Sequence, residues 1–165
     1  MIEFGIAKTD IDLKTILQLQ KENLPINISK EEAQKEGFVT VNHDLELLTE
    51  MNTPFPHIVA RDNGQVIAYA LVMLRSLEKK IPILVSMFEE INRIEYKSQL
   101  LNNSQYFVMG QICIKKGYRG HGIFHGLYNE MKERMKANFD YVITEVAERN
   151  IRSMKAHYKV GFENI

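Results

Sequence analysis

A glycine-rich segment is the part of the sequence best suited to binding an anion. The residues Tyr118–Phe124, YRGHGIF, follow an apolar run directly and precede an amphipathic pattern. A strand that passes straight into a helix leaves the first N–H groups of the helix unpaired, and glycine lets another molecule approach them. The helix dipole and Arg119 add positive charge. The segment therefore predicts a site for a phosphate or diphosphate, although the same glycines also occur in plain tight turns.

Two common nucleotide patterns do not fit this segment. The P-loop pattern, with its Lys-Ser/Thr pair, is absent. The dinucleotide pattern would need a glycine at position 125, where the chain has His125 and the glycine follows as Gly126. A mononucleotide-binding protein is therefore disfavoured as an interpretation.

A second group of polar residues follows the next apolar run. The segment 148–162, ERNIRSMKAHYKVGF, contains Asn150, Ser153 and Tyr158. Asn150 and Tyr158 are eight residues apart, a little over two helical turns, and we expect both to face one groove. Asn150 is also an ordinary helix N-cap residue, and both roles remain open.

The elements that position these groups follow from periodicity. Alternating or apolar runs predict strands over 2–8, on both sides of Asp62-Asn63-Gly64, and over 106–114 and 141–146. Helical spacing and capping residues predict helices over 11–23, 29–37, 43–51, 83–94, from 124 onward and over 151–159. The polar stretch 97–105 is expected to be a loop. The strand–helix–strand unit near the end implies a parallel strand pair.

Together, YRGHGIF and NIRSMKAHYKVGF resemble the GNAT superfamily of N-acyltransferases. In that family the first pattern opens the helix that binds the pyrophosphate of acetyl-CoA, and Arg119, Gly122 and Phe124 stand at its three defined places. The resemblance covers about residues 106–162. It implies an α/β (α+β) fold whose mixed, mostly antiparallel central sheet is flanked by helices and contains a splayed parallel strand pair.

Two positions depart from the family pattern. Phe124 stands where Gly or Ala is usual, so its ring either points into the core or narrows the site. The sequence ends at Ile165, where two further strands usually follow, so the C-terminal strands are expected to be short or missing.

The resemblance implies transfer of an acetyl group from acetyl-CoA to a primary amine, directly within a ternary complex. Tyr158 is implied as the general acid and Glu145 is a candidate base; His57, His121, His125 or a water chain are alternatives. The acceptor, a small molecule or a peptide, is expected to lie against 22–56 and 75–105. A non-catalytic module that binds acyl-CoA is the alternative function. The cofactor-binding residues implied are Ile112, Cys113, Ile114, Arg119, Gly120, His121, Gly122, Ile123, Phe124, Asn150 and Ser153.

Bulk composition sets further limits. The 165 residues favour one domain over 1–165, and the balance of 21 basic against 21 acidic residues disfavours a nucleic-acid partner. No signal peptide or apolar run of membrane-spanning length is visible, so we expect a cytoplasmic protein without a membrane partner. Cys113, the only cysteine, is expected to be a buried apolar residue. No residue spacing suggests a metal site, and a homodimer is compatible with the sequence.

Overall fold

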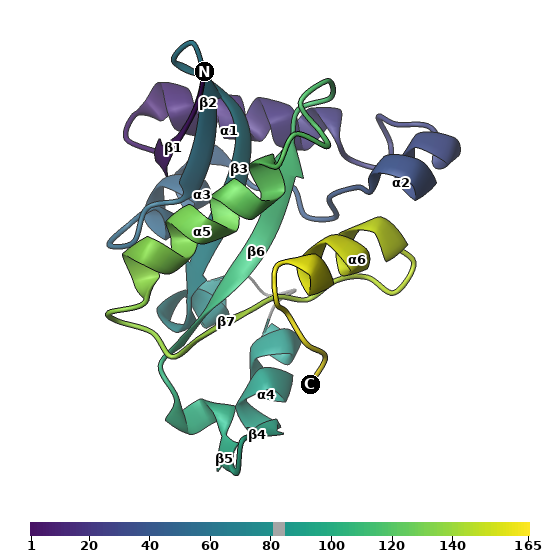
Figure 1. The fold of residues 1–165 in the computed structure, drawn as a ribbon. Coiled ribbons are helices and arrows are strands. Elements are labelled where there is room, and N and C mark those ends of the chain that lie inside the picture. Colours follow the sequence, from purple (N-terminus) through teal and green to yellow (C-terminus); the bar gives the residue numbers. More distant parts are fainter. Residues whose placement is uncertain (81–84) are drawn as a thin grey trace.

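Five strands form the central sheet in the order β1-β2-β3-β6-β7 (Figure 1). The computed structural model describes residues 1–80 and 85–165. All neighbouring strands pair antiparallel except β6 and β7, which are parallel. This arrangement confirms the expected fold class. The strands are β1 (Ile2–Ile6), β2 (Ile58–Asp62), β3 (Gln65–Leu74), β6 (Tyr106–Ile114) and β7 (Tyr141–Ile143).

Helices cover both faces of this sheet. One face packs against α5, and the opposite face packs against α1, α3 and α4, each face with its own apolar core cluster. The predicted start of α4 at 83–84 lies outside the described residues. After α6, the described residues 160–165 form no strand. The helices are α1 (Asp10–Glu22), α2 (Lys30–Glu36), α3 (Leu45–Met51), α4 (Val85–Arg93), α5 (Ile123–Met135) and α6 (Ile151–Lys159).

The predicted loop over 97–105 is wrong in part. Two short strands, β4 (Glu95–Tyr96) and β5 (Gln99–Leu100), pair there, and a 3₁₀ turn follows at Leu101–Asn103. Lys97 and Ser98 make the turn with φ of 49° and 66°. These residue types seldom adopt positive φ, whereas Asn63-Gly64, which turns the β2–β3 hairpin as predicted, does so readily.

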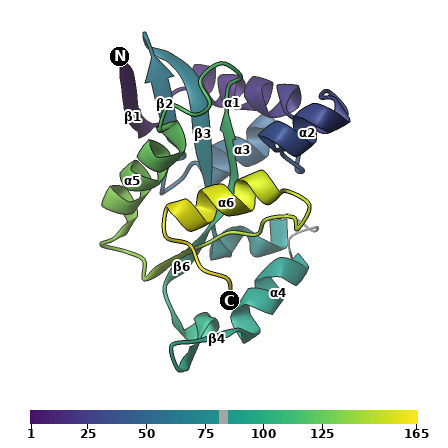
Figure 2. The same ribbon diagram turned by 45° about the vertical axis from the view of Figure 1, so that its right-hand side comes forward.

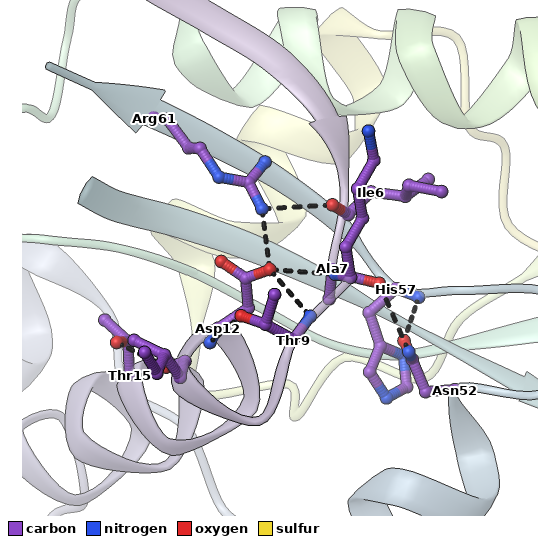
Figure 3. Close-up of polar contacts among 10 residues, drawn as sticks. Ile6, Ala7, Thr9, Asp12, Thr15, Asn52, His57 and Arg61 are labelled. Carbon is purple, nitrogen blue, oxygen red and sulfur yellow. Dashed lines mark hydrogen bonds and ion pairs between the residues drawn. The ribbon is translucent and has the colours of Figure 1, made fainter. Parts of the chain in front are cut away.

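The junction between β1 and α1 is held by Asp12 (Figure 3). Its carboxylate accepts the N–H groups of Lys8 at 2.8 Å and Thr9 at 3.1 Å, and it pairs with Arg61 at 2.9 Å. Thr9 in turn accepts the N–H of Asp12, completing a capping box. Burial raises the pKa of Asp12, but these hydrogen bonds outweigh burial and lower it. The N-terminal strand is thereby fixed to both α1 and β2.

Gly126 of α5 is a packing residue. A Cβ built at Gly126 would lie 2.1 Å from the ring of Phe4 on β1. We expect Gly126→Ala to reduce the free energy of unfolding by about 1–3 kcal/mol, the usual cost of overpacking. Denaturant unfolding measures this, and adding Phe4→Leu should recover part of the loss because the two residues are in contact. Equal losses with and without Phe4→Leu would contradict the contact.

A β-bulge in β6 changes the face that its side chains use. Ala70 pairs with Ile112 and Val72 with Met109, so β6 has one residue more than β3 across this interval. Before the bulge the even-numbered Val108 faces the core cluster that contains α1. After the bulge the odd-numbered Cys113 faces that cluster, so the alternation of faces has shifted by one residue. Gln111 is buried on that same side. The bulge lies where β6 and β7 separate.

Candidate acyl-transfer site

The parallel strands β6 and β7 separate after three paired residues. Their pairing runs from Tyr106 with Tyr141 to Val108 with Ile143, and the Thr144 hydroxyl then donates to the Met109 carbonyl at 3.0 Å. Beyond this point the remainder of β6 has no described strand on that edge. The splay that the resemblance implied is therefore present, and it leaves room beside residues 110–114.

Two cavities lie beside residues 110–114 and share part of their walls. The loop cavity, about 160 Å³, lies between the end of β6, the glycine segment and α6. The strand cavity, about 310 Å³, follows β6 from Val108 to Ile112 and reaches the segment after β7. Together they form one continuous trough beside the sheet, crossed by residues 37–43, which we call the strap. The residues common to both cavities are Phe38, Val39, Ile112, Asn150 and Ser153.

The glycine segment presents unpaired backbone donors. Gly120 and Gly122 have φ of 82° and 76°, and Gly122 is the N-cap residue of α5. A Cβ built at either glycine would meet no protein atom within 4 Å, so the space above them is open. The first backbone bond of α5 runs from the Gly126 N–H to the Gly122 carbonyl. Among the described residues, the N–H groups of 122–125 donate no hydrogen bond, so this cradle fits a diphosphate.

Arg119 places a cation beside this cradle but directs its hydrogen bonds elsewhere. Its Nε donates to the Ile114 carbonyl at 3.0 Å, and its guanidinium donates to the Asn23 side chain after α1. These bonds hold the glycine segment against the end of β6. Arg119 and Arg152 both line the loop cavity, and no carboxylate lines it among the described residues. The two arginines also line a neighbouring cavity together with Glu31 and Glu32.

Phe124 turns its ring toward the core. It packs on Tyr128 and His157, with ring centroids 5.2 Å and 5.1 Å apart, and is partly buried with the α5 cluster. The same ring lines the loop cavity. The large residue at this place thus forms a wall of the cavity while its N–H stays unpaired among the described residues. Ile123, the preceding residue, is buried in the core.

Asn150, just before α6, joins this helix to the strap. Figure 2 shows α6 next to α2, the helix that precedes the strap. Its side-chain oxygen accepts the Ser153 N–H at 3.2 Å, and its amide donates to the Phe38 carbonyl at 3.3 Å. Gly37 adopts φ of 78°, and a Cβ there would lie 3.1 Å from the Asn150 oxygen. Asn150 is therefore an N-cap, as the sequence allowed, and it also fixes one end of the strap over β6.

A buried amide network fixes the other end of the strap, and sequence reasoning did not find it. Gln111 accepts from Gln20 at 2.7 Å and from the Tyr69 hydroxyl at 2.5 Å, and it donates to the Val41 carbonyl at 2.9 Å. Gln20 also accepts the His43 N–H at 2.7 Å. In the sequence, the one sign of this network was a polar residue, Gln111, within the apolar run YFVMGQICI. The network makes the strap a rigid roof, because its polar groups are satisfied only in this position.

The expectation that Asn150 and Tyr158 face one groove is wrong. Tyr158 is 46% exposed and lines neither cavity, whereas His157 is buried and lines the strand cavity. Each helical residue turns the side-chain direction by about 100° around the helix axis. A separation of eight residues therefore leaves two side chains about 80° apart, whereas a separation of seven leaves them only about 20° apart. His157 is the seventh residue after Asn150 and therefore takes the inward position. The role of Tyr158 as a general acid stays a prediction.

His157 is held in its neutral form. Its Nδ1 lies 2.8 Å from the Ser153 carbonyl, which can only accept, so Nδ1 carries the proton and Nε2 accepts from the Tyr128 hydroxyl at 2.7 Å. Burial lowers the pKa of His157. Both ring nitrogens are engaged by protein groups, so His157 fixes α6 to α5 at the trough.

The other candidate residues lie in different environments. Glu145 is exposed, lines the strand cavity and makes no hydrogen bond or ion pair with any described residue. His57 is fully buried away from the trough, and the exposed His121 and His125 line neither cavity. Cys113 is buried and burial raises the pKa of its thiol to about 12, so it behaves as an apolar residue. Ile112, Cys113 and Ile114 line the loop cavity together.

The described residues contain neither a metal-binding cluster nor a membrane-spanning helix. No group of three or more His, Cys, Asp or Glu residues there could hold a metal ion. No described helix is both long and apolar enough to cross a bilayer.

The splayed parallel pair, with a backbone anion cradle where the following helix begins, is the arrangement that the resemblance to N-acyltransferases implied. The model of the acetyltransferase (GNAT) family matches residues 14–162, nearly the whole sequence. The chain therefore belongs to the GNAT acetyltransferase family. The subfamily is not assigned by this match.

Solved structures share the fold at low sequence identity. The ribosomal-protein-S18-alanine N-acetyltransferase from Escherichia coli is 12% identical, with a TM-score of 0.63 over 100% of this chain and 79% of its own. An aminoglycoside 6′-N-acetyltransferase from Acinetobacter baumannii is 16% identical, with a TM-score of 0.63 over 99% and 92%. The NatC complex, bound to Gag peptide and CoA, is 12% identical, with a TM-score of 0.62 over 99% and 86%. A search of curated protein sequences found no match.

Proposed function

We propose that this protein moves the acetyl group of acetyl-CoA directly to a primary amine while both substrates are bound. The observation that carries the proposal is the continuous trough, which joins a cationic backbone cradle to the open edge of β6. A diphosphate would bind at the cradle end of this trough, and an amine would bind at the end beside the open edge of β6. The N-acetyltransferases that share the fold, one of them bound to CoA, support this proposal.

The donor would be held by main-chain groups. The N–H groups of 120–125 would bind the diphosphate, with His121, Ile123 and Phe124 contributing through their backbone. The edge of β6 at 112–114 would pair with the pantetheine amides as an added strand does. Asn150 and Ser153, which border both cavities, would contact the same arm. This geometry orients the thioester, and orientation is a large part of the expected rate enhancement.

The proposed reaction exchanges one bond to the acetyl carbon for another. The amine lone pair forms a C–N bond, the C–S bond breaks, and its electron pair leaves on the CoA sulfur. The amine loses a proton, and the sulfur gains one from the protein or from water. A β6 backbone N–H would stabilise the charge that develops on the carbonyl oxygen.

The proton steps place different demands on the protein. We propose that Glu145, which lines the strand cavity with no described partner, takes the ammonium proton directly or through water. The leaving thiolate is a stable anion, since an ordinary thiol has a pKa near ~8.5, so it needs little help from an acid. Among the described residues of α6, Ser153 brings a hydroxyl to the trough, and both ring nitrogens of His157 are already hydrogen-bonded.

The part played by Tyr158 can be measured directly. Because its hydroxyl lies outside both cavities, we expect Tyr158→Phe to leave kcat and the affinity for CoA within about twofold of the parent, a difference of only ~0.4 kcal/mol. Steady-state kinetics and CoA titration measure the two quantities. A loss of kcat above about tenfold with unchanged CoA affinity would instead restore Tyr158 as the general acid.

Thiol release tests the proposed function. The protein is incubated with acetyl-CoA and a panel of primary amines, free CoA is measured, and the acetylated amine is identified by mass. We expect amine-dependent release, with initial-rate plots that intersect, as a ternary complex requires. Parallel plots would indicate a covalent acetyl-enzyme and contradict direct transfer.

A non-catalytic module that binds acyl-CoA is the second candidate. It is favoured by the environment of α6: both nitrogens of His157 are occupied by protein groups, and Tyr158 lines neither cavity. Saturable CoA binding without thiol release under any amine would support the module over the enzyme.

We also propose that residues 1–165 act as one acetyltransferase domain, because both core clusters pack on the same sheet. The acceptor, as a small molecule or a peptide, is an amine in either case. A cytoplasmic location and a homodimer remain proposals. Cell fractionation and light scattering test them.

A further inference from the structure

The two ends of the trough carry opposite charge. Arg119 and Arg152 line the loop cavity, which has no carboxylate in its described lining. Glu145 is the one formally charged side chain in the described lining of the strand cavity. Burial lowers the pKa values of the two histidines there, His43 and His157, so both add hydrogen-bonding groups but no positive charge. An amine entering the strand cavity therefore meets one carboxylate and no described cation.

The strand cavity has an apolar floor, whereas its other walls also carry polar side chains. Met73 and Val108 form a buried floor, and Met87 of α4 covers it from a partly buried position. Methionine side chains adapt to irregular apolar ligands. Gln111 lines the same cavity, but its acceptor and donor are already used by Gln20, Tyr69 and the strap. A substrate hydroxyl placed among these residues would lose its hydrogen bonds to water and gain few in return.

The size of this cavity suits a small molecule. Its volume of about 310 Å³ lies at the low end of the ~300–1,000 Å³ range of small-molecule pockets. The strap roofs it and is fixed at both ends, by Asn150 and by the Gln20–Gln111 network. The cavity therefore has a defined depth.

From these features we infer that the acceptor is a small primary amine with an apolar body and no carboxylate, its ammonium paired with Glu145 and its body against Met73 and Met87. This inference rests on the proposed acetyl transfer and narrows its substrate class. It excludes free amino acids, since their carboxylate would lie near Glu145 without a described cation. It also excludes amino sugars, whose hydroxyls would lie against the apolar floor of Met73 and Met87.

A matched set of acceptors tests the inference. Phenylethylamine and phenylalanine differ by one carboxylate, and glucosamine replaces the apolar body by a hydroxylated one. With acetyl-CoA saturating, we expect kcat/KM for phenylethylamine to exceed those of the other two by at least about 100-fold, the discrimination that unpaired buried polar groups can provide. A preference for phenylalanine, for glucosamine or for a peptide N-terminus overturns the inference while acetyl transfer stands.

Paired variants test the contacts. Glu145→Gln should raise KM for phenylethylamine about tenfold, the scale of one lost charge-assisted hydrogen bond, with KM for acetyl-CoA unchanged. Glu148→Gln removes the same charge three residues away, outside both cavities, and should change neither constant. Met87→Gln should reduce the preference for phenylethylamine over glucosamine several-fold. Equal effects of Glu145→Gln and Glu148→Gln would overturn the assigned ammonium contact.

Binding separates failure of the inference from failure of the proposed function. If CoA binds but no amine releases thiol, the proposed acetyl transfer is wrong. Thermal shifts of the CoA-saturated protein then decide the inference alone. Stabilisation by phenylethylamine that is absent with phenylalanine, and lost in Glu145→Gln, supports it; equal shifts or none overturn it.

Discussion

Gly122→Val should weaken CoA binding about 100-fold, a loss of ~2.7 kcal/mol. Gly122 adopts φ of 76°, which a β-branched residue rarely does, and no protein atom lies within 4 Å of the Cβ it lacks. The new side chain would therefore occupy the space above the cradle and also turn its N–H groups. Isothermal titration with CoA measures the loss.

Gly64→Val is a matched control for this variant. Gly64 turns the β2–β3 hairpin with φ of 79°, and a Cβ there also meets no atom within 4 Å. Both variants should lose comparable stability from backbone strain, but only Gly122→Val should lose affinity for CoA. If Gly122→Val binds CoA as the parent does, the cradle at 120–125 is not the diphosphate site.

The second large effect concerns stability at acid pH and comes from His57. Its Nδ1 accepts the Val72 N–H at 3.1 Å, so its Nε2 carries the proton and donates to the Leu48 carbonyl at 3.2 Å. Protonation would place an Nδ1–H against the Val72 N–H in a fully buried site. Burial accordingly lowers the pKa of His57 from 6.5 to about 4, although the bond to Leu48 opposes this.

The sign of the pH dependence follows from this shift. Between pH 6.5 and 4 the unfolded chain binds a proton at His57 that the folded chain does not, so folding stability is full above pH 6.5 and falls as the pH drops toward 4. The shift of about 2.5 units corresponds to a loss of about 3 kcal/mol. Urea unfolding at several pH values measures it.

His57→Gln tests the source of the loss. A glutamine amide offers one acceptor for Val72 and one donor for Leu48 but does not titrate in this range. The variant should therefore lose about 3 kcal/mol less than the parent over the same interval. His43 and His157 have lowered pKa values too and should leave a smaller slope of the same sign. An unchanged slope would contradict the assignment to His57.

Local signals in the sequence were reliable where neighbours in the chain decide the structure. The Asn63-Gly64 turn and the limits of β6 depend on short-range chemistry, and both were predicted. The Lys97-Ser98 turn was missed because its residue types do not favour positive φ. The structure instead makes this turn between paired strands.

The candidate site was predictable only where its parts are contiguous. The glycine cradle was visible because it is one segment. The roof was not, because Gln111 meets Gln20 across 91 residues of sequence and Val41 across 70. Adjacent helical residues such as His157 and Tyr158 differ by about 100° of rotation about the helix axis. Counting from Asn150, the spacing favours the seventh residue, His157, over the eighth, Tyr158. The sequence alone could therefore have corrected the expectation for Tyr158.

The bulge at Gly110–Gln111 makes the trough sensitive to the length of β6 as well as to the Gln111 side chain. Deleting either residue would restore a regular pleat and exchange the two faces of everything that follows, moving Cys113 to the layer of α5 and the neighbouring isoleucines to the layer of α1. A Cβ at Gly110, by contrast, would meet Met73 at an ordinary 3.7 Å. Homologues should thus vary in residue type at position 110 yet keep an invariant count of residues between Met109 and Ile112.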